Sequence, residues 1–421
     1  MRDTLTQLLM QQGDITHQLN LSNSQHLAKL TAMAEFLLSS KLDLFQLKAM
    51  EQELILHQAL AAKMAVKLAI SKMLLKQCRP NTLISVVFAM FKEHQRMLTS
   101  QQHPYGEDFI RRKVEQLQWL CDDNPNVDWR MIMVDDGCPN DSGLQACKQI
   151  KELEDGEKLE VCFLKEAIDR GLGPAAQLKT TADSQKGGSI AYGIWHAAQR
   201  EAHKDHFIAY TDADLSTHLG QLGLLVDNLT QHDNLIACGS RREPTSVVVK
   251  QGLRNHRGKL FIYLWKRLLP QLDNIIDTQC GFKMFRSDLV SELTQHMIES
   301  KFAFDLELLL KAQLSHPNRI GKVGVGWIDS DALSTTTELS PYLTMLKSIV
   351  KMYRSYVPAQ AVSDQFAQLI DALEEPQWVQ LVEAMADQVD SMDINLICQK
   401  ELFSANSLAS EAGITESVVS P

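Results

Sequence analysis

The chain has 421 residues, of which 45% are hydrophobic and 22% are charged, with a formal net charge of -10. This is an ordinary globular composition with enough apolar material for a large core and a second, smaller unit, and the acidic balance argues against nucleic-acid binding. No apolar run approaches the ~18 residues of a membrane span and the N-terminus lacks a signal peptide's apolar centre, so we expect a cytoplasmic protein.

Taken in chain order, residues 1 to about 78 predict helix almost throughout, because strong helix formers alternate with apolar residues at helical spacing. The sequence Arg79-Pro80-Asn81 ends this segment. From Tyr356 onward the pattern is again helical, and residues 355–421 carry eleven acidic side chains against Lys400 alone. We therefore expect helical extensions at 1–79 and 356–421 around a central domain at 80–355.

The central domain alternates short apolar runs with helical stretches. The runs are LISVVFAMF, WRMIMVDDG, LEVCFL, HFIAYTDAD and LIACGSR. Short buried strands joined by helical crossovers predict an α/β fold with a mostly parallel, Rossmann-like sheet. The eight cysteines form no C-x-x-C pair and several lie in these runs, so we expect buried thiols and neither disulfides nor a zinc site.

Acidic residues follow three of these strands: Glu93, the pair Asp135 and Asp136, and the pair Asp212 and Asp214. In an open parallel sheet the ligand lies beyond the carboxyl ends of the strands. Converging carboxylates need a compensating cation, and their oxygen ligands suit Mg²⁺ or Mn²⁺. The alternative is that these aspartates only form turns or cap the helix that begins near Leu219.

Several motifs in order resemble the family 2 glycosyltransferases of GT-A fold, in the branch of the dolichyl-phosphate glucosyl- and mannosyltransferases. They are VVFAMFKE, VDDGCPND, KGGSIAYGI, YTDADLST, CGSRR, DTQCGFKMFRSD, FAFDLELL and VGWIDSDALST, between about Thr82 and Tyr353. The resemblance implies a metal-dependent, inverting transferase that moves a hexose from a nucleotide sugar, with UDP-glucose and GDP-mannose as the first candidates.

On the donor side, the resemblance implies that Glu93, Asp135 and Asp136 bind the nucleotide and that Lys186 approaches the donor. It implies that Asp214, with Asp212 directly or through the ribose, holds the metal. The alternative for Lys186 is a solvated lysine in a flexible glycine-rich loop.

On the acceptor side, the resemblance points to Gln279 and Gly281 beside the sugar, with packing in a buried turn as the alternative. It points to Asp305 as the base, with Glu307 as the next candidate. Asp305 could instead cap its helix. Residues that could grip phosphates include Arg241 and Arg257, in a segment that could equally be an ordinary solvated basic loop.

The acceptor is either a polyprenyl phosphate or a soluble compound. In the N-terminal helices, Lys63, Lys67, Lys72 and Lys76 lie at roughly helical spacing, which suits peripheral contact at the inner face of a membrane. Packing against the central domain or a homodimer partner is the alternative. A nucleotidyltransferase and a catalytically silent relative acting as an interaction module are the competing functions.

Overall fold

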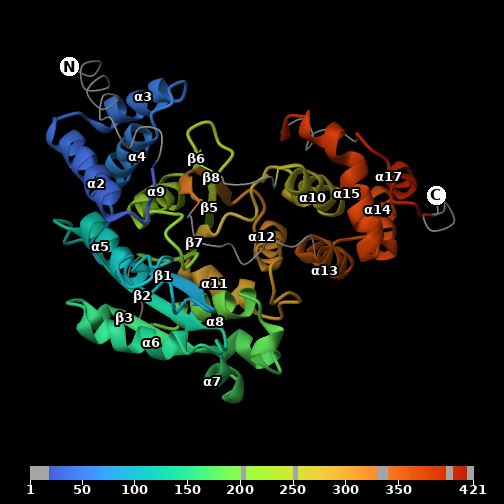
Figure 1. Ribbon diagram of the computed structural model, residues 1–421, viewed down its shortest axis with the longest axis horizontal. Helices are drawn as coiled ribbons and strands as arrows, with labels where there is room; N and C mark the ends of the chain where they lie inside the picture. Colours follow the sequence, from blue (N-terminus) through green and yellow to red (C-terminus); the bar gives the residue numbers. More distant parts are fainter. Residues whose placement is uncertain (1–18, 201–204, 250–254, 330–339, 395–401, 415–421) are drawn as a thin grey trace. The chain divides into compact units, whose positions relative to one another are not determined.

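The structure is a computed structural model, and it describes residues 19–200, 205–249, 255–329, 340–394 and 402–414 (Figure 1). The chain divides into two compact units. Unit 1 comprises residues 1–250, 279–296 and 318–332, and unit 2 comprises residues 251–278, 297–317 and 333–421. The predicted boundaries at 79 and 355 do not coincide with this division.

Unit 1 contains two sheets and the helices that surround them. Its strands are β1 (Thr82–Met90), β2 (Val127–Asp135), β3 (Leu159–Phe163), β4 (Asp205–Thr211), β5 (Ile236–Ser240), β6 (Val247–Val249), β7 (Phe282–Arg286), β8 (Ile320–Gly324) and β9 (Gly326–Ile328). Its helices are α2 (Ser24–Ser39), α3 (Leu44–Leu54), α4 (Leu60–Leu75), α5 (Phe109–Cys121), α6 (Ser142–Gln149), α7 (Leu164–Asp169), α8 (Gly187–Ala198), α9 (Leu222–Gln231) and α11 (Ser287–Thr294).

The main sheet has seven strands in the order β3-β2-β1-β4-β7-β5-β8. Strands β3, β2, β1 and β4 are parallel, β7 runs antiparallel between β4 and β5, and β8 is parallel to β5. The five predicted strands are all present, and the mostly parallel α/β sheet expected of the GT-A fold is confirmed. The prediction does not identify β7 and β8 of the main sheet or the small sheet of β6 and β9, and the β7 sequence FKMFR enters it only as part of a motif.

Helices cover both faces of this sheet, which explains why all but one residue of β1 and all but one residue of β4 are buried. Alternate β1 residues, Ile84, Val86 and Phe88, share a core with apolar residues of α4, α5 and α9. The intervening Val87 faces α8, where a Cβ on Gly193 would lie 2.5 Å from Val87 Cγ1. That glycine therefore lets α8 pack tightly against the strand.

The N-terminal helices belong to unit 1 and do not form a separate extension. Helix α4 is apolar on nearly every side and packs against α2, α3 and α9, so it is a core helix. Lys67 and Lys72 are 1% and 6% exposed, and their Nζ atoms lie 2.6 Å from Glu51 and 3.0 Å from Glu35. The predicted lysine face for membrane contact is therefore wrong, because two of its four cations are buried in ion pairs.

Unit 2 is helical in its described part. Its helices are α10 (Asn255–Leu268), α12 (Phe304–Ser315), α13 (Ser340–Tyr356), α14 (Ala361–Ala372), α15 (Glu375–Asp390) and α17 (Ala405–Glu411). Helix α10 packs against α13, α14 and α15, and the buried Lys259 Nζ donates to three carbonyl oxygens at the end of α15, those of Val389, Asp390 and Met392. Across the described residues of both units, every helix is too short or too polar to cross a bilayer.

Candidate active site

The carboxyl end of β2 carries two buried aspartates with different partners. Asp135 accepts hydrogen bonds from three backbone N–H groups: Gly137 and Cys138 at 3.0 Å to Oδ1, and Gly143 at 2.8 Å to Oδ2. These bonds fix the turn from β2 into α6. The Asp135 carboxylate is therefore largely occupied in holding the backbone.

Asp136 instead connects this turn to α8. Its Oδ1 accepts from Ser189 Oγ at 2.6 Å, and its Oδ2 accepts from the backbone N–H of Lys186 at 2.9 Å. Burial raises the pKa of the Asp136 carboxyl above its usual range, partly offset by its hydroxyl and backbone donors. Ser189 was not among the predicted site residues, although it lies in the KGGSIAYGI motif.

Lys186 stands at the N-terminus of α8 in a strained backbone conformation, with φ 83° and ψ -49°. Its Nζ makes an ion pair with Asp212 Oδ1. The side chains of Lys186 and Asp212 are 31% and 25% exposed, so the pair is open to a ligand. The Lys-Gly-Gly motif and the D-x-D motif, which the sequence places 26 residues apart, therefore meet at one point.

Gly281 joins the same cluster from the segment that leads into β7. A Cβ atom at this position would lie 2.5 Å from Asp212 Oδ1 and 2.7 Å from its Cγ. Any residue other than glycine at position 281 would therefore displace the Asp212 carboxylate. The resemblance assigns Gly281 to the acceptor side, whereas its immediate neighbour in the structure is Asp212 of the D-x-D motif.

Asp214 is half-buried beyond β4, and its Oδ1 accepts from the backbone N–H of Ser216 at 3.0 Å. Burial, reinforced by the charge of Asp212, raises the pKa of the Asp214 carboxyl above its usual range. The capping alternative is wrong for this residue, because the 3-10 turn Leu219–Gln221 is capped by His218, whose Nδ1 accepts from the Gly220 N–H at 2.9 Å.

A lysine that the motifs did not reveal supports the same loop. Lys113 of α5 is fully buried, and its Nζ donates to the backbone carbonyl of Asp214 at 2.8 Å. Burial lowers the pKa of Lys113 to about 8, against the attraction of Asp214 and Asp212. In the sequence, Lys113 differs from a solvated lysine only in lying on the apolar side of its helix, and this position alone does not indicate a functional residue.

Glu93, beyond β1, pairs with Arg96 at 3.2 Å, and its side chain is 13% exposed. Burial raises the pKa of the Glu93 carboxyl to about 7, although Arg96 opposes this shift. The nearby charge of Asp214 also contributes to the shift, which places Glu93 in the electrostatic neighbourhood of the D-x-D motif.

The other predicted phosphate and acceptor residues lie in separate surroundings within their own units. Arg241, after β5, lies over the Trp327 ring at 4.9 Å from its centroid. Gln279 is half-buried, and its Nε2 atom has no hydrogen-bond partner in the described part of the chain. Arg257 belongs to α10 of unit 2, and its side chain lies outside the described residues.

The two base candidates both lie on α12 of unit 2 but differ in their surroundings. Glu307 is fully buried and accepts from the backbone N–H groups of Ile298 and Glu299, each at 2.7 Å, and from Tyr356 Oη at 2.5 Å. Asp305 is 4% exposed and lies one residue inside the helix, whose N-cap is Ala303. The predicted capping alternative for Asp305 is therefore wrong.

Comparison with known proteins places these motifs in context. No family model matches the chain. It is 26% identical to the human dolichyl-phosphate beta-glucosyltransferase over 64% of this chain and 73% of that protein. The same enzyme from Drosophila melanogaster is 26% identical over 64% and 72%, and that from Dictyostelium discoideum is 29% identical over 43% and 54%.

Among solved structures, glucosyl-3-phosphoglycerate synthase from Mycobacterium tuberculosis aligns with 70% of this chain and 86% of its own, at 15% identity and a TM-score of 0.44. This likeness is too distant to argue about ligands. The sequence similarities confirm the resemblance that the motifs predicted: the chain is similar in sequence to glycosyltransferases, among them several dolichyl-phosphate beta-glucosyltransferases.

Proposed function

We propose that this chain is a metal-dependent hexosyltransferase that uses a nucleotide sugar as its donor. The observation that carries the proposal is the meeting of Lys186, Asp212 and Gly281, from three separate motifs, beside Asp214 at the carboxyl ends of the strands. The relatives are named glucosyltransferases, so UDP-glucose is the first donor to test.

The residues present fit a divalent cation. Asp212 and Asp214 supply hard oxygen ligands. Burial and the charge of Asp212 raise the pKa of Asp214, and the cations Lys113 and Arg96 only partly oppose this shift, so a further cation would be accommodated there. A Mg²⁺ or Mn²⁺ ion held there would balance the charge of a departing nucleoside diphosphate. Lys186 would contact the same diphosphate, and Asp135 or Asp136 would accept hydrogen bonds from the nucleoside in addition to those that both carboxylates already accept.

In the proposed step, an acceptor oxygen attacks the anomeric carbon of the donor sugar. The bond between this carbon and the diphosphate breaks, and the nucleoside diphosphate leaves with the electron pair. Inversion at the anomeric carbon follows. A hydroxyl acceptor must lose a proton, for which Asp305 is the proposed base, because Glu307 already holds three hydrogen-bond donors. A phosphate acceptor brings its own negative oxygen and needs no base.

The names of the relatives favour a polyprenyl phosphate as acceptor. The experiment is transfer from radiolabelled UDP-glucose with Mn²⁺, offered either a polyprenyl phosphate in detergent or a panel of soluble phosphates and hydroxyl compounds. Labelled lipid product supports the lipid acceptor, and labelled soluble product alone refutes it.

The control for this assay is Asp169→Asn, which alters an exposed ion pair with Lys165 on α7 and should keep full activity. Asp214→Asn should abolish transfer. No transfer and no donor hydrolysis with any nucleotide sugar, in a folded protein supplied with Mn²⁺ and both acceptor classes, would contradict the proposed function.

A further inference from the structure

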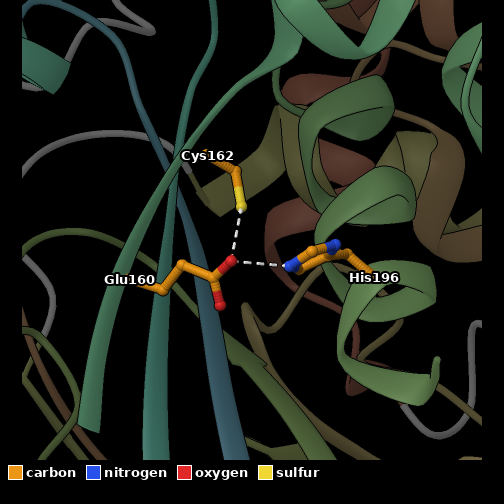
Figure 2. A group of neighbouring side chains, drawn as sticks. All are labelled: Glu160, Cys162 and His196. Carbon is orange, nitrogen blue, oxygen red and sulfur yellow. Dashed lines mark hydrogen bonds and ion pairs between the residues drawn. The ribbon is translucent and has the colours of Figure 1, made fainter. Parts of the chain in front are cut away.

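A second group of possible metal ligands lies on the edge strand of the main sheet (Figure 2). Glu160 and Cys162 project from β3, and His196 projects toward them from α8 (Figure 2). The His196 Nε2 atom lies 2.8 Å from Glu160 Oε1, and Cys162 Sγ lies 3.8 Å from the same oxygen. Among the described residues, Glu160, Cys162 and His196 form the one group of three possible metal ligands whose ligand atoms all lie within 4.8 Å of one another.

The fold brings these side chains together for a simple reason. Glu160 and Cys162 are two residues apart on a strand, so they point to the same face of the sheet. Helix α8 packs on β1 and β2 and carries His196 in its last turn. The sequence could not reveal the group, because the histidine follows the cysteine by 34 positions, without the close spacing of a zinc motif.

The arrangement leaves one carboxylate oxygen available to a cation. Arg200 makes an ion pair with Glu160 Oε2, so this oxygen is held while Oε1 faces both the imidazole and the thiol. A cavity of about 200 Å³ adjoins Glu160 and Arg200, and it also contacts Arg130, Ile132, Lys158 and Leu159. Of the three possible ligands it borders Glu160, and it offers room for a water molecule beside that carboxylate.

We propose that Glu160, Cys162 and His196 bind a zinc ion, with water from the adjoining cavity as the fourth ligand. One thiolate, one imidazole and one carboxylate are the ligand types that zinc accepts together, whereas Mg²⁺ and Mn²⁺ prefer oxygen alone. Tetrahedral zinc with bonds of roughly 2.0 to 2.3 Å holds its ligand atoms about 3 to 4 Å apart. The observed separations lie close to this range, so small side-chain movements suffice.

Binding replaces the thiol proton of Cys162, which passes to solvent, and the zinc–sulfur bond takes its place. Zinc then ties β3, which pairs with β2 alone, to helix α8. The site is separate from the carboxylates proposed for the donor metal, because Asp212 and Asp214 lie beyond β4 and offer no sulfur. The two proposals can therefore fail independently.

The test uses the full chain, freed of metal by a chelator and titrated with Co²⁺ in excess Mg²⁺. Only a cobalt ion bound to a thiolate produces a sulfur-to-metal charge-transfer band in the near ultraviolet. We expect this band to saturate at one Co²⁺ per chain and to disappear when Zn²⁺ is added. Zinc should also raise the melting temperature by several degrees, because it binds the folded state.

The matched variants are Cys162→Ser, which should abolish the band, and Cys147→Ser, which alters a half-buried cysteine of α6 and should retain it. His196→Gln should weaken Co²⁺ binding by about tenfold or more. Should Cys162→Ser fail to fold by circular dichroism, Glu160→Gln serves as the second ligand variant.

A folded wild-type chain without the band overturns the proposal, and so does a band that survives in Cys162→Ser. A lower melting temperature in Glu160→Gln, together with the absence of a cobalt band in the wild type, would show that Glu160, His196 and Arg200 form only an ion-pair network. This outcome also overturns the zinc proposal.

Discussion

Replacing Gly281 by alanine would place a Cβ atom 2.5 Å from Asp212 Oδ1, whereas ordinary van der Waals contact begins at 3.4 Å. The Asp212 carboxylate must therefore move by roughly 1 Å, away from its ion pair with Lys186. A partly exposed ion pair is worth up to about 1 kcal/mol, so the expected loss of melting temperature is only about 2 to 4 °C. A misplacement of about 1 Å at a reacting centre can cost roughly 10²-fold in rate. We therefore expect kcat/KM to fall about 10²-fold in a folded enzyme.

The measurements are initial rates with UDP-glucose, the affinity for UDP with and without Mn²⁺ by calorimetry, and thermal melting. Gly258→Ala is the control, because a Cβ there meets no atom within 4 Å. In the Asp212→Ala background the alanine at 281 should cost no further stability, since the atoms that it would displace are gone. A Gly281→Ala enzyme with wild-type kcat/KM, or an equal stability loss in both backgrounds, would refute the reasoning.

Three further variants test the site. Asp214→Asn should lose activity and the Mn²⁺ dependence of UDP binding while its melting temperature is unchanged or higher, because burial already opposes that charge; full activity would remove the metal from the mechanism. Asp305→Asn should lower kcat by about 10² with a hydroxyl acceptor and far less with a phosphate, and an unaltered kcat with both would eliminate it as the base. Glu93→Gln should be more stable than wild type at neutral pH, because ionisation of a carboxyl whose folded pKa is about 7 opposes folding. This gain should be absent below about pH 4.5 and should grow as the pH rises to 7. Equal melting temperatures of the two proteins across this range would count against a buried charge at Glu93.

Local patterns predicted the strands of the sheet and the motifs at their ends. Short runs rich in branched and aromatic residues, such as Val86, Val87 and Phe88, favour a strand buried on both faces, and a parallel sheet places the following polar residues at one edge. The position of β7 between β4 and β5, however, depends on which strands pair, and this information is spread over residues far apart in the chain. The contact between Gly281 and Asp212 could not be predicted for that reason.

The role of the N-terminal helices was also beyond the sequence patterns. The composition of α4 predicts a helix, but its lysines look the same whether they face lipid, solvent or a glutamate of a neighbouring helix. The partners Glu35 and Glu51 lie in other helices, 37 and 16 positions away, so only the packed structure reveals that Lys72 and Lys67 are neutralised inside unit 1. Lys113 escaped notice similarly, since its partner is a backbone carbonyl about a hundred residues later.

The antiparallel strand β7 has a consequence for how the protein is made. Strand β5 is joined to β4 only through β7, and residues 251–278 of unit 2 lie between β5 and β7 in the chain. On the ribosome, β5 therefore emerges before both of its partners in the main sheet, and its pairing with β7 must wait until Arg286 has been synthesised. Pairing across such a separation is slow, and the unpaired edges of β4 and β5 stay available to other chains meanwhile. We expect the nascent protein to depend on chaperones during this interval more than its mature stability would suggest.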